Sequence, residues 1–187
     1  AILKNKNVSI VMDIGSNPDK EFSNNYQSGA LSFELSCTKE KVICNSGYFQ
    51  NYKHRLNNIS RSTATHSTLI LDNTSITKFK KEINGCSKIK KNFKILNKKI
   101  INEKNVLSLT ASHDGYQKRY GTIHERKIEF YPNNNKLIGF DKLIKKKNFK
   151  STNFEIRFHL LPKSKVTKTQ DGNVILIELE NSGWKFS

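Results

Sequence analysis

The chain has 187 residues, which is about the size of one large domain. Its 11 Phe, 6 Tyr and 1 Trp exclude a wholly disordered polypeptide. No window approaches roughly 18 uncharged apolar residues, so a membrane-spanning helix is excluded as well.

Basic residues are in large excess. Lys and Arg number 33 against 16 Asp and Glu, which gives a formal net charge of +17 and favours polyanionic partners in general. Most of these residues are Lys, and Asn and Ile are abundant too, a composition that an AT-rich coding sequence produces without selection for binding. A nucleic-acid-binding β domain would rest on charge alone, because no aromatic and basic stacking motif is present, so we expect no specific nucleic-acid partner. The Lys run 145–147 is expected to be a solvated loop tip.

Short runs of alternating apolar and polar residues, separated by Asn, Gly, Asp and Pro, predict strands and turns along the chain. The expected strands are residues 7–14, 30–36, 41–45, 67–72, 93–96, 106–112, 122–131, 136–143, 154–161, 173–180 and 183–186. Eleven strands without a helix predict an all-β fold, a large antiparallel β-sandwich that occupies residues 1–187 as one domain. Ile128 and Phe130 should face the core. Residues 78–105 have the poorest alternation, which fits either a long excursion or an edge hairpin.

The three cysteines fit no zinc-ligand spacing, because the chain has no C-x-x-C pair. Cys37 and Cys44 are placed to face each other across a hairpin with its tip at 38–41. One disulfide between them is conceivable, and the odd number of cysteines would then leave Cys86 outside it. Cysteine usage does not decide the compartment.

The segment RSTATHSTL (61–69) passes from small polar residues into an apolar strand. We expect Arg61 and His66 to project from a loop lip, where an imidazole can serve as a ligand or a proton carrier. The competing interpretation is that His66 is a buried residue at the start of a strand. The chain has no Gly-x-Ser-x-Gly elbow, glycine-rich phosphate loop or His-Glu-x-x-His motif.

Several blocks in order along the chain resemble the C-terminal domain of heparinase II/III-like polysaccharide lyases. They are GALSFELS (29–36), NSG (45–47), RSTATHSTL (61–69), ASHDGY (111–116), GTIHER (121–126), FHLLP (158–162) and GWKF (183–186). The resemblance implies a β-sandwich that follows a helical toroid domain, with a polysaccharide cleft between the two. It also implies a periplasmic or cell-envelope location and cleavage of a uronate-containing acidic polysaccharide by β-elimination.

The resemblance also implies a zinc site, from which this chain departs. The family pattern has a His-x-His-x-Asp segment before the Leu-Ser-Phe block, and here its positions read Asn25, Gln27 and Gly29. The Asp that precedes a Gly reads Asn45, and His66 alone is kept. Amide oxygens are poor zinc ligands, so a degenerate metal site of Gln27, Asn45 and His66 is expected to bind zinc weakly, and the fold should form without metal.

We therefore expect Arg61, His66 and Tyr48 to contact the sugar chain, while the catalytic base lies on the preceding helical domain. The chain begins at Ala1 rather than Met, as expected for a piece of a longer protein, and the piece alone should be inactive. The alternative is a non-catalytic carbohydrate-binding or cell-envelope structural module, which the lost His and Asp positions favour.

Overall fold

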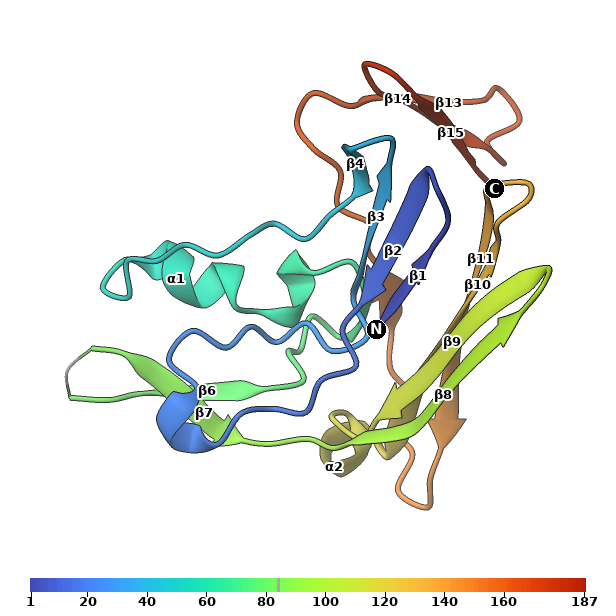
Figure 1. Cartoon of the computed structure of the whole chain (residues 1–187). Coiled ribbons are helices and arrows are strands. Elements are labelled where there is room, and N and C mark those ends of the chain that lie inside the picture. Colours follow the sequence, from blue (N-terminus) through green and yellow to red (C-terminus); the bar gives the residue numbers. More distant parts are fainter. Residues whose placement is uncertain (84) are drawn as a thin grey trace.

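The computed structural model describes residues 1–83 and 85–187, and most of its regular structure is antiparallel strand. Two four-stranded sheets face each other, with the orders β1-β2-β3-β4 and β11-β10-β9-β8 (Figure 1). Their strands are β1 (Ile2–Lys4), β2 (Val8–Met12), β3 (Phe33–Cys37), β4 (Glu40–Ile43), β8 (Ile95–Glu103), β9 (Val106–His113), β10 (Thr122–Tyr131) and β11 (Lys136–Lys145). This arrangement is the predicted β-sandwich.

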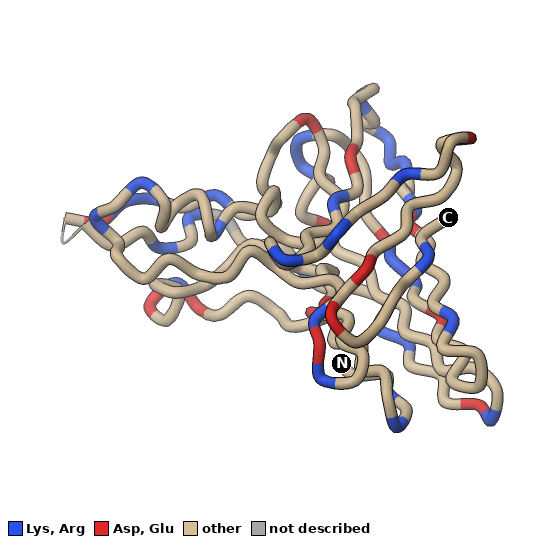
Figure 2. The backbone as a smooth tube through the Cα atoms, turned by 90° about the horizontal axis from the view of Figure 1, so that it is seen from above, with Lys and Arg blue, Asp and Glu red and all other residues tan. Residues whose placement is uncertain are grey.

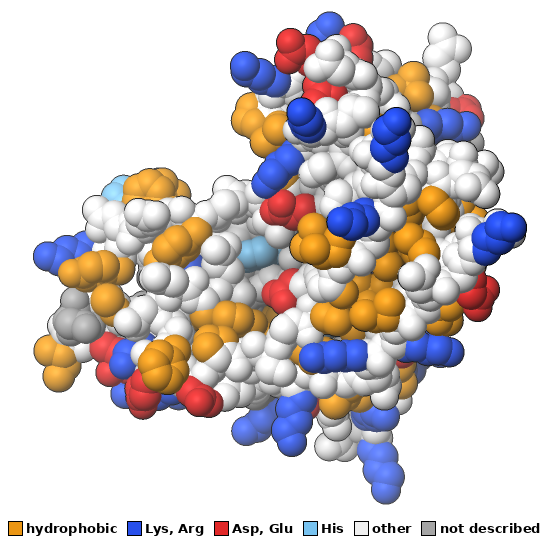
Figure 3. Space-filling view, viewed as in Figure 1, with side chains coloured by type: hydrophobic (Ala, Val, Ile, Leu, Met, Phe, Trp, Pro, Cys, Tyr) orange, Lys and Arg blue, Asp and Glu red, His pale blue; other side chains and the backbone are white. Residues whose placement is uncertain are grey.

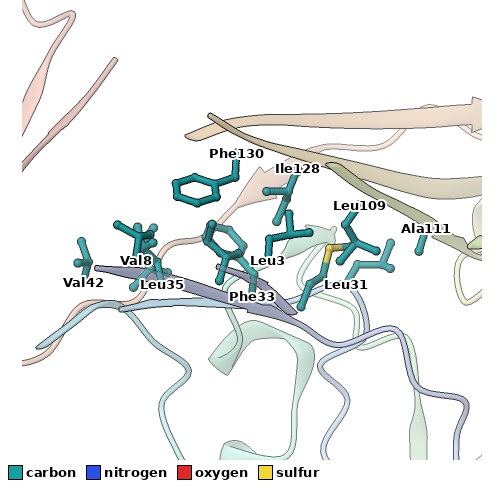
Figure 4. Packing of buried hydrophobic residues seen from close by; sticks show 13 residues of the cluster. Leu3, Val8, Leu31, Phe33, Leu35, Val42, Leu109, Ala111, Ile128 and Phe130 are labelled. Atoms are coloured by element: carbon teal, nitrogen blue, oxygen red, sulfur yellow. The ribbon is translucent and has the colours of Figure 1, made fainter. Parts of the chain in front are cut away.

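The main core fills the space between these two sheets. Side chains of β2 and β3 meet those of β9 and β10, as Figure 4 shows for Phe33 opposite Phe130. Strand β10 alternates as predicted, with Ile128 and Phe130 buried and Glu129 between them half-buried. Complete burial of such side chains contributes about 1.5–3 kcal/mol each, so the sandwich is stabilised by its own core.

A lobe extends from the sandwich, to the left in Figure 1. It consists of η1 (Lys20–Phe22), α1 (Arg55–Ser60), β6 (Lys78–Lys81) and β7 (Ser87–Lys91) with their connecting segments. Strands β6 and β7 pair antiparallel, with Phe79 opposite Ile89. Residues 78–105 therefore contain this separate hairpin and then β8 (Ile95–Glu103) at the edge of the second sheet, so neither interpretation describes the whole stretch.

Smaller elements complete the fold. Strand β12 (Phe154–Ile156) pairs with β5 (Leu69–Leu71), and β13 (Lys165–Lys168), β14 (Ile175–Glu178) and β15 (Gly183–Phe186) form a three-stranded sheet near the C-terminus. The short helices η2 (Thr63–Thr65) and α2 (Gln117–Tyr120) lie in connections. None of the helices in the described ranges is long and apolar enough to cross a membrane.

The structure differs from the sequence prediction in several short elements and in β8, which spans residues 95–103 where a strand was expected only at 93–96. The described residues form fifteen strands, and the additional ones are β1, β6, β7 and β13. The two short α-helices were not predicted, because a helix of four to six residues cannot show the periodicity of an amphipathic face. Cys37 lies opposite Glu40, whereas Cys44 follows β4 and forms a bridge with His159. Cys37 and Cys44 therefore do not face each other, and no disulfide joins them.

Candidate functional site

A hollow separates the lobe from the sandwich (Figure 3), with a histidine side chain on its floor and acidic side chains beside it. Charge alone does not mark this place, because Lys and Arg are spread along the whole backbone (Figure 2). The site must therefore be identified from the hydrogen bonds of the residues that the sequence singled out.

His66 follows η2 and lies at the entrance to β5, with 4% of its surface exposed. Its Nδ1 lies 2.8 Å from the Ser62 carbonyl oxygen, and its Nε2 lies 3.3 Å from the side-chain oxygen of Gln27. Burial lowers the pKa of His66, although the Ser62 carbonyl and Asp13 oppose that effect. A neutral ring that donates from Nδ1 leaves Nε2 as an acceptor, so Gln27 must turn its amide NH2 toward it.

The residues at the expected metal positions do not fit zinc. Gln27 faces His66, but the Asn45 side-chain oxygen accepts a hydrogen bond from the Ser67 amide at 2.9 Å, and its nitrogen reaches Ser32. In the part of the chain that the structure describes, no three His, Cys, Asp or Glu side chains are grouped to hold a metal. One imidazole and two amides are a weak donor set for zinc.

Tyr48 belongs to a second polar contact on the lobe side. Its hydroxyl donates to the Asn25 side-chain oxygen at 3.0 Å and accepts from the Asn57 amide at 3.0 Å. Asn57 lies on α1, is buried, and also donates to the Phe49 carbonyl at 2.7 Å. The sequence analysis missed Asn57, because an Asn in a polar segment carries no periodicity signal.

Arg61 does not lie at the surface. It has no exposed area, and its three guanidinium nitrogens donate to the carbonyls of Tyr26, Ser87 and Ser23 at 2.8, 2.8 and 2.7 Å. Its Cζ also lies 4.1 Å from the centroid of the Phe79 ring. The expectation that Arg61 and His66 project from a loop lip is wrong, because the Arg61 guanidinium is the polar centre of the lobe and His66 is buried at the start of a strand.

The predicted residues nevertheless converge on one stretch of chain, residues 23–29. Arg61 holds its start through two carbonyls, Tyr48 contacts Asn25, and His66 contacts Gln27. A Cβ atom added to Gly29 would lie 2.4 Å from Cδ2 of His66, so only glycine fits beside this ring. A carboxylate at position 29, as in the family pattern, is incompatible with this position of His66.

A buried polar network in the sandwich contacts the backbone next to His66. Arg126 forms two hydrogen bonds to Asp141 at 2.8 and 2.9 Å, and also donates to the carbonyls of Leu31 and Ser67. Ser67 adjoins His66, so the network fixes the backbone that carries this ring. Arg126 and Asp141 are directly opposite in the β10–β11 register.

Two histidines extend the network. His124 Nε2 lies 2.6 Å from Asp141, and His124 Nδ1 lies 3.3 Å from Nε2 of His113, whose Nδ1 accepts from the Gly115 amide. Burial raises the pKa of Asp141, but hydrogen bonds from His124 and Arg126 outweigh this effect and hold it at about 2. Burial lowers the pKa of both histidines, most strongly for His113. Both rings are therefore neutral, with each donating from Nε2.

The sequence analysis did not single out this network, although a signal for it existed. His124 and Arg126 share the parity of Ile128 and Phe130, which were predicted to face the core. A core-facing Arg requires a buried partner, and Asp141 stands at the matching position of the next strand.

Comparison with known proteins agrees with this architecture. The sequence profile of the family described as "Heparinase II/III-like, C-terminal" matches residues 1–187. No curated protein matches the chain. The heparan sulfate lyase HepC from Pedobacter heparinus is similar in structure over 95% of this chain, with a TM-score of 0.70 and 20% identity. The heparinase III BT4657 gene product matches 95% of this chain with a TM-score of 0.71 and 17% identity.

In both cases this chain spans 25% of the length of the solved structure. Identities this low show the shared β-sandwich, and the match of the family profile over the entire length shows the family. The chain belongs to the heparinase II/III-like C-terminal domain family.

Proposed function

We propose that the chain is the C-terminal part of a polysaccharide lyase and that it binds a uronate-containing acidic polysaccharide at the hollow beside residues 23–29. The observation that carries this proposal is the convergence of Tyr48, through Asn25, and His66, through Gln27, on that one segment. Hydroxyl, amide and imidazole groups in one place suit a ligand that carries many hydroxyl and carboxylate oxygens.

His66 would act as a hydrogen-bond acceptor for the sugar. The Ser62 carbonyl fixes the proton on Nδ1, and burial keeps the ring neutral near pH 7. A sugar hydroxyl that displaces the Gln27 amide would donate to Nε2. Gln27 is half-buried, so its side chain can be displaced without opening the core.

β-Elimination needs a base for the proton α to the carboxylate, a positive group that neutralises the carboxylate, and an acid for the leaving oxygen. Arg61 is unavailable for the second task, because its donors are turned to backbone carbonyls inside the lobe. We infer that the base and the neutralising group come from a preceding helical domain of a longer protein, as in the resemblance, and that this piece alone is inactive. A periplasmic or cell-envelope location is part of the same proposal.

A second candidate function is a non-catalytic carbohydrate-binding or cell-envelope structural module. The amides at positions 25, 27 and 45 favour it, because they retain polar contacts but supply neither a metal ligand set nor a proton carrier.

The test makes the same replacement, His by Asn, at two positions of the longer protein, His66→Asn and His54→Asn. His54 is exposed and caps α1 by accepting from the Leu56 amide, a role that Asn also performs. We expect unsaturated uronate product from the parent, at least tenfold less of it with His66→Asn, and less than a twofold change with His54→Asn. An inactive parent that still binds the uronate polymer in preference to a neutral glucan supports the second candidate, and equal losses in the two variants contradict the site.

A further inference from the structure

We propose that two adjoining depressions around α2 form a second site for an anionic saccharide chain, separate from the hollow at His66. The inference rests on the proposed function, because it takes the same class of polymer as its ligand. It extends that function to an exposed cationic surface at another part of the fold, the lower end of the sandwich in Figure 1.

The two depressions share one wall. The first, of about 300 Å³, is lined by residues of the 74–78 segment and of α2, and the second, of about 450 Å³, is lined by α2 and the loop at 146–148. Lys118 lines both of them. None of the residues that carry the His66 hollow lines either depression.

Five cationic side chains border the pair of depressions: Lys78, Lys118, Arg119, Lys146 and Lys147. All five are exposed, and no carboxylate in the described ranges lies within ion-pair distance of any of them. Unpaired cations gathered around concave surface create a positive potential that attracts an anionic ligand. The Lys run at 145–147 thus has neighbours that its sequence did not reveal.

The backbone that carries these cations is fixed. The Lys146 amide donates to the Gly121 carbonyl at 2.7 Å, and the Lys150 amide donates to the Tyr120 carbonyl at 3.0 Å. Gly121 has φ +63°, and a Cβ there would lie 2.2 Å from the backbone of Asn148. The loop is therefore fastened to the C-terminal end of α2, so Lys118, Lys146 and Lys147 keep their relative places.

The first depression also offers hydroxyl groups and an oriented guanidinium. Thr74 and Ser75 line it, and Arg119 has its Cζ 5.3 Å from the centroid of the Tyr120 ring. Hydroxyls beside cations suit a ligand that alternates hydroxyl groups with carboxylate or sulfate groups. Tyr116 and Tyr120 are buried, so no aromatic face is presented for stacking of bases, which disfavours a single-stranded nucleic acid.

The test measures the affinity of the chain for a heparan sulfate oligosaccharide in two triple variants of equal charge change. One is Lys118→Ala/Lys146→Ala/Lys147→Ala. The control is Lys6→Ala/Lys104→Ala/Lys136→Ala, which removes three exposed lysines in or directly beside hairpin turns at the other end of the sandwich. We expect at least a tenfold loss of affinity at about 0.05 M salt in the first variant and less than a threefold loss in the control.

Equal losses in the two triples overturn the second site, because the binding then follows net charge alone. Tighter binding of a DNA duplex of matched charge, lost in the first triple, also overturns it in favour of a nucleic-acid surface. The proposed function is judged separately, by the uronate product that the longer protein forms with and without His66→Asn. If the longer protein is active but both triple variants lose the same affinity, only the second site is rejected. If the longer protein is inactive but only the first triple variant loses affinity, only the lyase activity is rejected.

Discussion

The lobe and the sandwich each contain a fully buried arginine, and the two are stabilised differently. Arg126 in the sandwich is bonded to the carboxylate of Asp141 on the next strand and to two backbone carbonyls. Arg61 in the lobe is bonded to three carbonyls and lies over the Phe79 ring, with no carboxylate at ion-pair distance among the described residues. Burial lowers the pKa of Arg61.

The two arginines fix the backbone on the two sides of the hollow, Arg126 in the sandwich and Arg61 in the lobe. The sheet register sets Arg126 and Asp141 opposite each other, so the sandwich side is fixed by a paired charge within regular structure. The lobe has little regular structure of its own, and Arg61 joins the ends of η1, α1 and β7 through backbone dipoles. Loss of Arg61 should disturb residues 23–29 and increase local unfolding of the lobe. Loss of Arg126 should disturb the backbone at His66 and lower the global stability of the sandwich.

Asp141→Ala should have the largest effect on stability. It leaves Arg126 buried without its counterion and His124 without its acceptor, and such a loss costs about 3–5 kcal/mol of unfolding free energy. Urea denaturation gives the value. Glu155→Ala, which breaks the exposed pair with Arg157, is the control and should cost less than about 1 kcal/mol.

The double variant Arg126→Met/Asp141→Leu separates the loss of the pair from the cost of an unpaired buried charge. It retains no buried charge, so we expect it to be more stable than Asp141→Ala. An Asp141→Ala protein as stable as Glu155→Ala would show that the buried pair does not hold the sandwich together.

Arg61→Met should have the second-largest effect. It should lower the free energy of unfolding by at least about 2 kcal/mol, because three carbonyls inside the lobe lose their charged donor. Hydrogen exchange should place the loss of protection in the lobe, for example at the Ile89 amide that donates to the Ser23 hydroxyl. Arg55→Met on the exposed face of α1 is the matched control and should be nearly neutral. Unchanged exchange in the lobe of Arg61→Met speaks against its role as the polar centre.

Gly29→Ala should cost about 1–3 kcal/mol, because the added methyl group meets the His66 ring and must displace it. Gly139→Ala on β11 has open space around the new Cβ and no positive φ, so it serves as the control. Thermal denaturation measures both, and equal melting temperatures would mean that the ring is free to move.

Acidification should produce the smallest and most gradual effect. The folded-state pKa values of His113 and His124 are lowered, so the unfolded chain binds more protons once the pH falls below about 6.5. Stability should then decrease with falling pH, by up to about 1.4 kcal/mol per pH unit for each buried histidine. Asp141 adds a further loss only between its ordinary pKa and about 2. Urea midpoints that stay constant from pH 7.5 to about 5 would contradict neutral buried histidines.

The sequence predicted the sandwich well, because period-two alternation marks strands such as β10 whose faces differ in burial. It failed at β1, β6, β7 and β13, which are only three to five residues long, so that their pairing partners rather than their own pattern decide their structure.

At the candidate site, the sequence did not predict that Arg61 and His66 are buried. Small polar residues around Arg61 indicated a surface loop, yet Thr63 is buried and its hydroxyl donates to the Ser28 carbonyl at 2.8 Å. Which carbonyls turn toward a guanidinium depends on tertiary structure, and no spacing along the chain encodes it. The amides at positions 25, 27 and 45 predict weak zinc binding from residue type alone, and this stays a prediction.

We propose that the polysaccharide lies beside residues 23–29 and reaches His66. The most direct measurement is an NMR titration that follows the imidazole signals of all five histidines as a uronate-containing oligosaccharide is added. The account predicts a saturable shift of His66, no shift of the core residues His113 and His124, and no response to a neutral glucan. Saturable binding that leaves His66 unchanged would contradict the account.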